Sequence, residues 1–119
     1  MGVAERLRDA INGHDLDALL DCFGPDYRSE QPVHPDRDFR GSEQLRANWE
    51  RILRDVPDLH AELLRSTAGD DAVWAEWLWT GNYSDGSPFE VAGVSILGVS
   101  EGRVAWARFY LEPVERDSS

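Results

Sequence analysis

Three consecutive strand-like runs fill the last third of the chain and constrain its fold more than any other feature. They are Val73–Gly81, Phe89–Val99 and Arg103–Pro113. Turn signals separate them, Ser84-Asp85-Gly86 after the first run and Ser100-Glu101-Gly102 after the second. Glycine tolerates the positive φ of a tight two-residue turn. The sequence therefore predicts an antiparallel meander joined by two hairpins.

The front of the chain predicts helices instead of strands. Val3–Asn12 and Glu43–Asp55 carry apolar side chains at helical spacing. A short helix over Leu16–Phe23 follows Asp15, a residue type that caps helix N-termini well. We expect Ser42 to cap the third helix in the same way.

Two further strands are expected, over Asp26–Gln31 and Leu59–Thr67, and a loop containing Pro32, Pro35 and Gly41 follows the first of them. Helices followed by an antiparallel meander are typical of an α+β domain whose helices pack on one face of a curved sheet. A length of 119 residues suits a single domain. We place it at residues 1–114 and predict a disordered polar tail over residues 115–119.

The charge balance and the cysteine count narrow the expected partners and location. The chain has 12 basic and 23 acidic side chains, a net charge of −11, and no basic patch interleaved with aromatic residues. Neither nucleic acid nor an anionic membrane surface is therefore an expected partner. The one cysteine, Cys22, cannot form an intramolecular disulfide, and we interpret it as a buried thiol. With no apolar leader segment, these features predict a cytoplasmic protein.

The strand faces predict an assembly. Side chains alternate along a strand, and Trp77 and Trp79 share one face of the first run while Trp74 lies on the other. In the last run one face carries Trp106, Arg108, Tyr110 and Glu112, and the other carries Ala105, Ala107, Phe109 and Leu111. A sheet with water on one side alternates more cleanly than this. We therefore expect helices on one face and a second subunit on the other, in a homodimer formed through the sheet.

The aromatic strands also carry ionisable groups, and this combination is typical of a small-molecule pocket. Tryptophan is more often part of a plain hydrophobic core than of a ligand platform, and both interpretations stay open. The residues predicted to line the pocket are Tyr27, Glu30, Trp49, Leu53, Trp77, Trp79, Arg108 and Tyr110. The expected ligand is a small apolar molecule.

Several segments resemble a known superfamily. Residues 12–20, NGHDLDALL, together with the following Phe23, Asp26 and Tyr27, resemble the start of nuclear-transport-factor-2-like domains. The closing residues 102–112 are similar to the SnoaL-like branch of that superfamily. The resemblance implies a cone, in which a strongly curved antiparallel sheet wraps around about three N-terminal helices and leaves a pocket at its open end. Members of the superfamily are often dimers.

The resemblance also implies where catalytic groups would lie. A ketosteroid isomerase would have its general-base Asp at Gln31, its oxyanion Tyr near Leu7 and its second acid near Ser95, and none of these groups is present. An epoxide hydrolase of this fold would have an Arg and an Asp where Trp77 and Trp79 stand. Neither chemistry is expected in its known form.

Three residues are catalytic candidates: Glu112, His34 and Gln31. Polyketide cyclases of the SnoaL type use an acid–base Asp in the last strand, and Glu112 takes that place. It would act as a general acid or base with its pKa raised by aromatic walls, or it is a solvent-exposed strand-end residue. His34, in a loop fixed by two prolines, would shuttle protons or is an ordinary loop histidine.

Two placements cannot be decided from the sequence. Either Glu30 or Gln31 faces the pocket: the resemblance favours Gln31, and a slip of one residue would favour Glu30. If Arg108 is buried, its ion-pair partner comes from another strand, with Glu76 and Glu90 as the options.

Three functions follow as hypotheses. The chain is a cofactor-free cyclase, isomerase or hydratase acting on an apolar oxygenated substrate, a binding module without chemistry, or a structural dimer with a filled core. No spacing of Cys and His fits a zinc site. Phosphate-binding loops, dinucleotide fingerprints and nucleophile motifs are also missing, so neither a metal nor a cofactor is expected.

Overall fold

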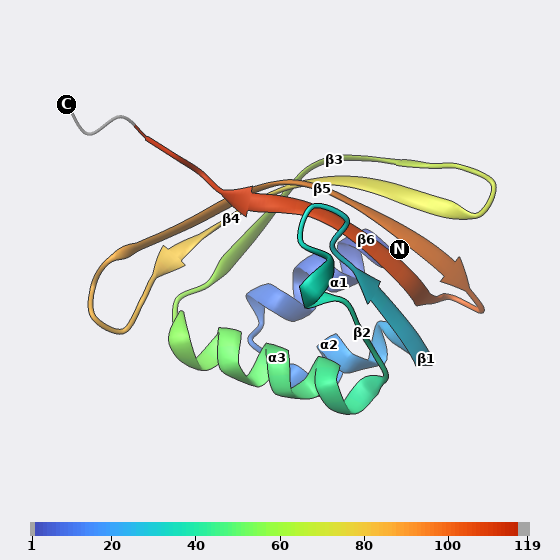
Figure 1. Cartoon of the computed structure of the whole chain (residues 1–119), viewed down its shortest axis with the longest axis horizontal. Coiled ribbons are helices and arrows are strands. Elements are labelled where there is room, and N and C mark those ends of the chain that lie inside the picture. Colours follow the sequence, from blue (N-terminus) through green and yellow to red (C-terminus); the bar gives the residue numbers. More distant parts are fainter. Residues whose placement is uncertain (1, 117–119) are drawn as a thin grey trace.

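The computed structural model describes residues 2–116 and confirms the predicted α+β architecture. The elements in chain order are α1 (Val3–Asn12), α2 (Leu16–Asp21), β1 (Phe23–Glu30), the 3-10 turn η1 (Pro35–Arg37), β2 (Phe39–Arg40), α3 (Ser42–Asp55), β3 (His60–Ala68), β4 (Ala72–Asn82), β5 (Pro88–Ser100) and β6 (Arg103–Pro113). All three helices lie on one side of a curved sheet (Figure 1). Within residues 2–116, none of the helices has the length and apolarity that crossing a membrane requires.

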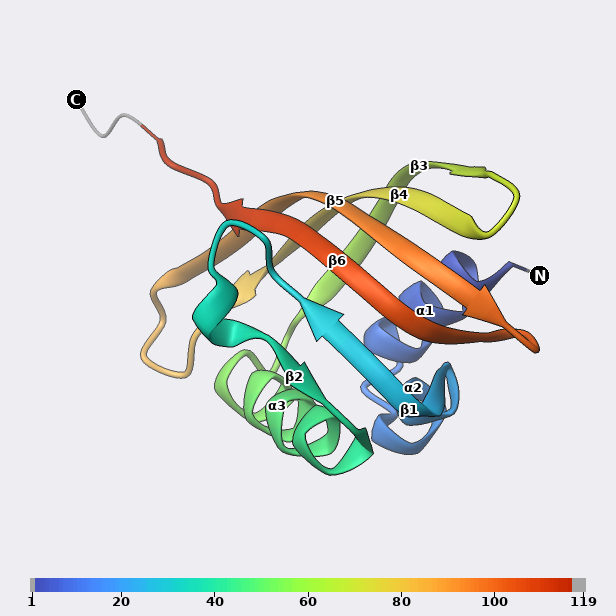
Figure 2. The ribbon, with the colours of Figure 1, turned by 45° about the vertical axis from the view of Figure 1, so that its right-hand side comes forward.

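The strands form one sheet in the order β2-β1-β6-β5-β4-β3. Strands β3 to β6 make the predicted antiparallel meander, but β1 runs parallel to β6. The sheet is therefore mixed, and the expectation of a wholly antiparallel sheet is wrong at this pair. Parallel neighbouring strands need a long crossover connection. In this chain it contains η1, β2, α3, β3, β4 and β5. Figure 2 shows β1 between β2 and β6.

Two short connections, between α1 and α2 and between β5 and β6, show how local chemistry sets where elements begin and end. Asp15 caps α2 as predicted, because its carboxylate accepts a hydrogen bond from the amide of Ala18 at 3.1 Å. The β5–β6 hairpin also has its expected two-residue turn, with φ of 54° at Glu101 and 76° at Gly102. Positive φ at both positions is the conformation whose twist matches that of the flanking strands.

Two predicted boundaries are wrong. Helix α2 ends at Asp21, so Cys22 lies at its C-terminal cap, although this thiol is buried as expected. Ser42 is the first residue of α3 and makes no capping bond, because Gly41 occupies the cap position. Gly41 has φ of 96°, a conformation that glycine adopts readily.

The predicted tail, residues 115–119, lies partly within the described residues. Arg116 lies against Glu90 of β5, with its Nε and Nη2 atoms 2.7 and 2.6 Å from the two carboxylate oxygens. Such a bidentate contact is the geometry in which arginine and carboxylate pair best. Residues 117–119 of the predicted tail lie outside the described residues.

The core lies between the helices and the side of the sheet that they cover, which we call the inner face; the opposite side is the outer face. Leu7 and Ile11 of α1, Leu19 of α2 and Leu45 of α3 are all buried there. Trp77 of β4 is fully buried, whereas Trp74 of the same strand is 51% exposed on the outer face. The helices therefore cover only one face of the sheet.

Candidate functional site

Three tryptophans meet on the inner face and form what we call the inner aromatic cluster: Trp49 of α3 with Trp77 and Trp79 of β4. The ring centroids of Trp49 and Trp79 are 5.7 Å apart, and those of Trp77 and Trp79 are 6.0 Å apart. All three side chains are buried. Their rings occupy the inner side of the sheet, where the sequence predicts the walls of a pocket.

The indole N–H groups of Trp77 and Trp79 differ in their hydrogen-bond partners. Trp77 Nε1 donates a hydrogen bond to Ser95 Oγ at 2.9 Å, across the β4–β5 pair. Trp79 Nε1 is buried and has no acceptor within residues 2–116. Buried indole N–H groups usually have a hydrogen-bond partner, so Trp79 is an exception that needs a physical explanation.

Tyr27 extends the aromatic surface along β1. Its ring lies 4.6 Å from that of Phe23 and 6.0 Å from that of Phe39, measured between centroids. The phenol is almost fully buried, and this burial raises its pKa well above the ordinary value of 10. It therefore stays neutral over the physiological range and cannot serve as a base.

Half-buried apolar side chains surround this core, and we call them the apolar rim: Phe39, Leu53, Phe89, Val91, Phe109 and Leu111. Strand register places Val91 directly beside Trp79. It also places Phe109 beside Ser95. The rim is the part of the inner face that solvent can still reach.

No carboxylate or imidazole side chain of residues 2–116 is fully buried on the inner face. Among residues 2–116, the buried polar side chains besides Tyr27 are Ser29 and Ser95. The predicted catalytic groups lie elsewhere. The inner aromatic cluster and its rim therefore present apolar side chains without a buried general acid or base.

His34 and Glu112 are close together, at the edge of the sheet. The imidazole Nε2 of His34 lies 2.6 Å from the carboxylate Oε1 of Glu112. Leu111 faces the core, so alternation directs Glu112 to the outer face. Both side chains are half-exposed. Glu112 therefore lies on the opposite face of the sheet from Trp77 and Trp79, two of the residues predicted to line the pocket.

Glu30 and Arg108 also lie together on the outer face, as a cross-strand pair of β1 and β6 with an N–O distance of 3.4 Å. Arg108 is half-exposed and pairs with neither Glu76 nor Glu90, the two options considered for a buried Arg108. Glu76 pairs with Arg65 at 2.8 Å, and Glu90 pairs with Arg116. Both members of the Glu30–Arg108 pair are well solvated, so it adds little stability.

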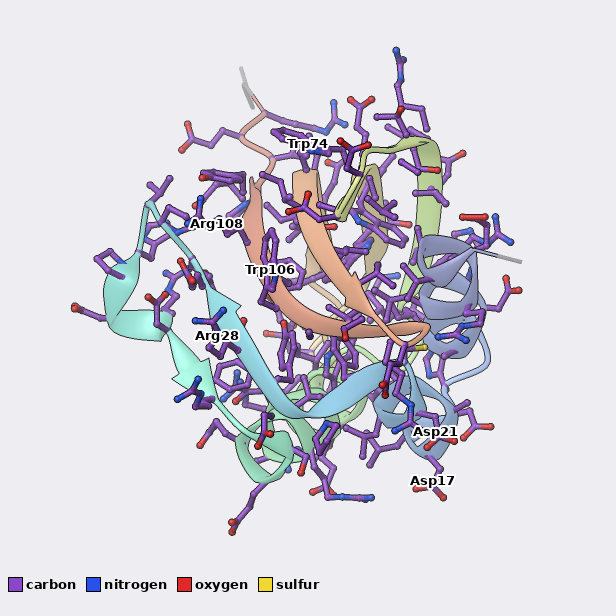
Figure 3. All side chains as sticks on the ribbon, turned by 90° about the vertical axis from the view of Figure 1, so that its right-hand side faces the viewer. Asp17, Asp21, Arg28, Trp74, Trp106 and Arg108 are labelled. Atoms are coloured by element: carbon purple, nitrogen blue, oxygen red, sulfur yellow. The ribbon has the colours of Figure 1, made fainter. Side chains whose placement is uncertain are left out.

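Figure 3 views the molecule along its long axis and labels several residues of these strands. Arg28 projects from β1, Trp106 and Arg108 from β6, and Trp74 stands at the far side of the molecule from the α2 carboxylates Asp17 and Asp21. Tyr110, 39% exposed, belongs to the outer face.

Gln31 follows the end of β1 and borders a polar groove of about 390 Å³. Its backbone amide donates to Asp38 Oδ1 at 2.7 Å, and its side-chain oxygen accepts a hydrogen bond from Arg37 at 3.4 Å. Glu30 lies on the outer face, where it pairs with Arg108, and so does not face the inner aromatic cluster. The backbone carbonyl of Gln31 also accepts a hydrogen bond from the His34 amide at 2.7 Å, so Gln31 lies beside the His34–Glu112 pair, while its side-chain oxygen is bonded by Arg37.

The structure thus divides the predicted site between the two faces of the sheet. Tyr27, Trp49, Leu53, Trp77 and Trp79 belong to the inner face. The others, Glu30, His34, Arg108, Tyr110 and Glu112, gather at the outer face or its edge. Sequence reasoning missed Ser95 as a hydrogen-bond partner and Phe109 and Leu111 as rim residues; strict alternation along β5 and β6 was the available signal.

Comparison with known proteins agrees with this architecture. The family model described as SnoaL-like domain matches residues 4–107. None of the curated proteins matches the chain in sequence.

Three solved structures illustrate the fold. A SnoaL-like protein of unknown function from Burkholderia thailandensis is 27% identical, with a TM-score of 0.71 and coverage of 94% of this chain and 92% of that one. IdmH from Streptomyces antibioticus, proposed to be a polyketide cyclase, is 21% identical, with a TM-score of 0.78 and coverage of 93% and 88%. An epoxide hydrolase from M. tuberculosis is 19% identical, with a TM-score of 0.78 and coverage of 92% and 80%. The last two likenesses show the fold alone.

Proposed function

The chain belongs to the SnoaL-like domain family, and we propose that it binds a small apolar molecule against the inner aromatic cluster without acid–base chemistry at that place. One observation carries this proposal. Trp49, Trp77 and Trp79 meet on the inner face, while the described ionisable candidates lie on the outer face or at its edge.

The chemistry of the inner face defines the ligand. Apolar and aromatic walls with few polar groups bind molecules mainly by removing apolar surface from water. A charged ligand would lose its hydration there without gaining a partner. The ligand is therefore neutral. We propose that it enters between the half-buried side chains of the apolar rim.

Binding is tested with two matched two-ring probes, the hydrocarbon tetralin and the ketone 1-tetralone. Quenching of tryptophan fluorescence measures the affinity of each probe. We expect saturable quenching with the wild-type protein. Leu53→Lys places a charge on the apolar rim and weakens both probes more than tenfold. Trp74→Phe, which changes a tryptophan on the outer face, leaves both affinities unchanged. Absence of saturable binding of either probe up to 1 mM would show the proposal to be wrong.

A second candidate function rests on the 2.6 Å contact between His34 and Glu112. A neighbouring imidazole and carboxylate form a pair that can accept and return a proton. We propose enolisation of a ketone as its simplest reaction: the pair takes the α-proton, the enolate forms, and a solvent deuteron is added back in D2O. Exchange at the α-carbon of 1-tetralone, measured by NMR, tests it. Glu112→Gln and His34→Ala must each abolish any enzyme-dependent exchange.

We also propose that the functional unit is a homodimer formed through the outer face. Trp74 projects from that face beside a mostly apolar depression of about 280 Å³, lined by Thr67, Glu76 and Val94 among others. A two-fold interface uses the same patch on both subunits. The tryptophan of each copy can therefore fill the depression of the other, which makes a second copy of this chain the partner that the surface fits.

A further inference from the structure

Trp79 combines deep burial with an unused hydrogen-bond donor. Its side chain is 8% exposed, and Nε1 has no acceptor within residues 2–116. Trp77 provides the comparison within the same molecule. It lies two residues earlier on the same face of β4, and its Nε1 donates to Ser95 at 2.9 Å. The chain therefore supplies an acceptor for one indole and leaves the other without one.

The unpaired indole N–H carries a cost in the free protein. A buried donor without a partner destabilises a fold, because it gives up its hydrogen bond to water and gains none in return. A phenylalanine would fill much of the same space without that cost. The group is therefore best explained by an acceptor that is present only when the site is occupied.

The surroundings of Trp79 identify the kind of acceptor. Its strand neighbours on the inner face are Ala61 and Val91, and the rings of Trp49 and Trp77 lie close by. None of these side chains has an acceptor oxygen. A buried water typically makes about three hydrogen bonds, and these side chains offer it no acceptor and few donors.

We propose that Trp79 Nε1 is the polar anchor of the ligand site and donates a hydrogen bond to a carbonyl oxygen of a neutral, apolar ligand. This inference rests on the proposed binding at the inner aromatic cluster. It narrows the ligand to neutral carbonyl compounds, such as ketones, quinones, esters and lactones, in which one carbonyl oxygen accepts from the single donor. A hydrocarbon of the same shape would bind to the same walls without the hydrogen bond.

The test uses the five indole N–H signals of the 15N-labelled protein, with the Trp79→Phe variant to identify the Trp79 signal. On addition of 1-tetralone, we expect the Trp79 indole proton to move downfield as the hydrogen bond forms. Tetralin should not move it downfield. In Trp79→Phe, 1-tetralone should bind about 3- to 10-fold more weakly, the effect of one neutral hydrogen bond, while tetralin keeps its affinity.

The possible results of these titrations distinguish the hydrogen-bond anchor from the proposed binding function. If both probes bind but the Trp79 signal responds to them alike, the anchor is wrong and the proposed binding function stands. If neither probe binds, both are wrong. Trp77→Phe is the matched control, because the N–H of Trp77 already donates to Ser95. This substitution should not change the ratio of the affinities for 1-tetralone and tetralin. Should Trp79→Phe fold poorly, the wild-type spectra decide, because one indole signal must move with the ketone and stay with the hydrocarbon.

Discussion

His34 Nε2 lies 2.6 Å from Glu112 Oε1, and the two residues are 78 positions apart in the sequence. The contact joins the loop after β1 to the end of β6, beyond the last register pair of these parallel strands, Glu30 with Arg108. It lies on the opposite side of the sheet from the inner aromatic cluster. Ligand binding and proton transfer, if the chain does both, therefore use separate parts of the molecule.

This separation predicts that the His34–Glu112 pair can be removed without loss of ligand binding. Glu112→Gln should leave tetralin affinity within twofold of wild type. It should lower the free energy of unfolding by at most about 1 kcal/mol, because half-exposed ion pairs contribute little. Urea unfolding and fluorescence titration measure the two quantities. A tenfold loss of tetralin affinity would mean that Glu112 reaches the ligand after all.

The Trp77–Ser95 hydrogen bond predicts a much larger stability effect from a smaller change. Ser95→Ala leaves the buried Nε1 of Trp77 without a partner and should cost about 1–3 kcal/mol. Ser66→Ala, at an exposed position of β3, is the control and should stay within about 0.5 kcal/mol of wild type. Urea unfolding compares them; equal stabilities for the two variants would contradict the assigned hydrogen bond.

The exposed Trp74 predicts the oligomeric state. Light scattering on a sizing column should give the mass of a dimer for the wild type at micromolar concentration, and of a monomer for Trp74→Lys, because the substitution buries a charge at the interface. Val33→Lys is the matched control, since Val33 is 62% exposed but lies in the loop after β1. A wild-type protein that runs as a monomer would rule out the proposed dimer.

The burial of Tyr27 predicts loss of stability at alkaline pH. Its pKa in the folded protein lies above the ordinary value of 10, so the folded state holds the phenolic proton more tightly than the unfolded chain does. The stabilisation is complete below pH 10. Above that pH the unfolded chain ionises first, and stability falls by roughly 1.4 kcal/mol for each further pH unit until the folded protein also ionises.

Comparison of variants isolates this contribution to the pH dependence. Tyr27→Phe should remove the Tyr27 part of the alkaline slope in urea unfolding experiments between pH 9 and 12. Tyr83→Phe, in the exposed β4–β5 turn, should keep it. Parallel curves for wild type and Tyr27→Phe would show that the phenol is hydrated in the folded protein.

Local patterns in the sequence were enough to predict the elements. The helical spacing of α1, the Asp15 cap and the Glu101-Gly102 turn all concern residues within a few positions of each other, so their energetics can be judged without the rest of the fold. Period-two alternation likewise placed Trp106, Arg108, Tyr110 and Glu112 on one face of β6. The failure at Ser42 is instructive, because Gly41 takes the cap position that a serine side chain would otherwise fill.

The sequence by itself determined which residues share a strand face, because alternation is a property of one strand. Only the tertiary structure decided which face meets the helices. The β4–β5–β6 register, with Trp77 beside Gly93 and Gly93 beside Leu111, puts Leu111 on the inner face and hence Glu112 on the outer face. The parallel β1–β6 pairing and the His34–Glu112 contact depend on the same long-range packing. No local pattern contains that information, because it depends on how strands distant in sequence align their hydrogen bonds.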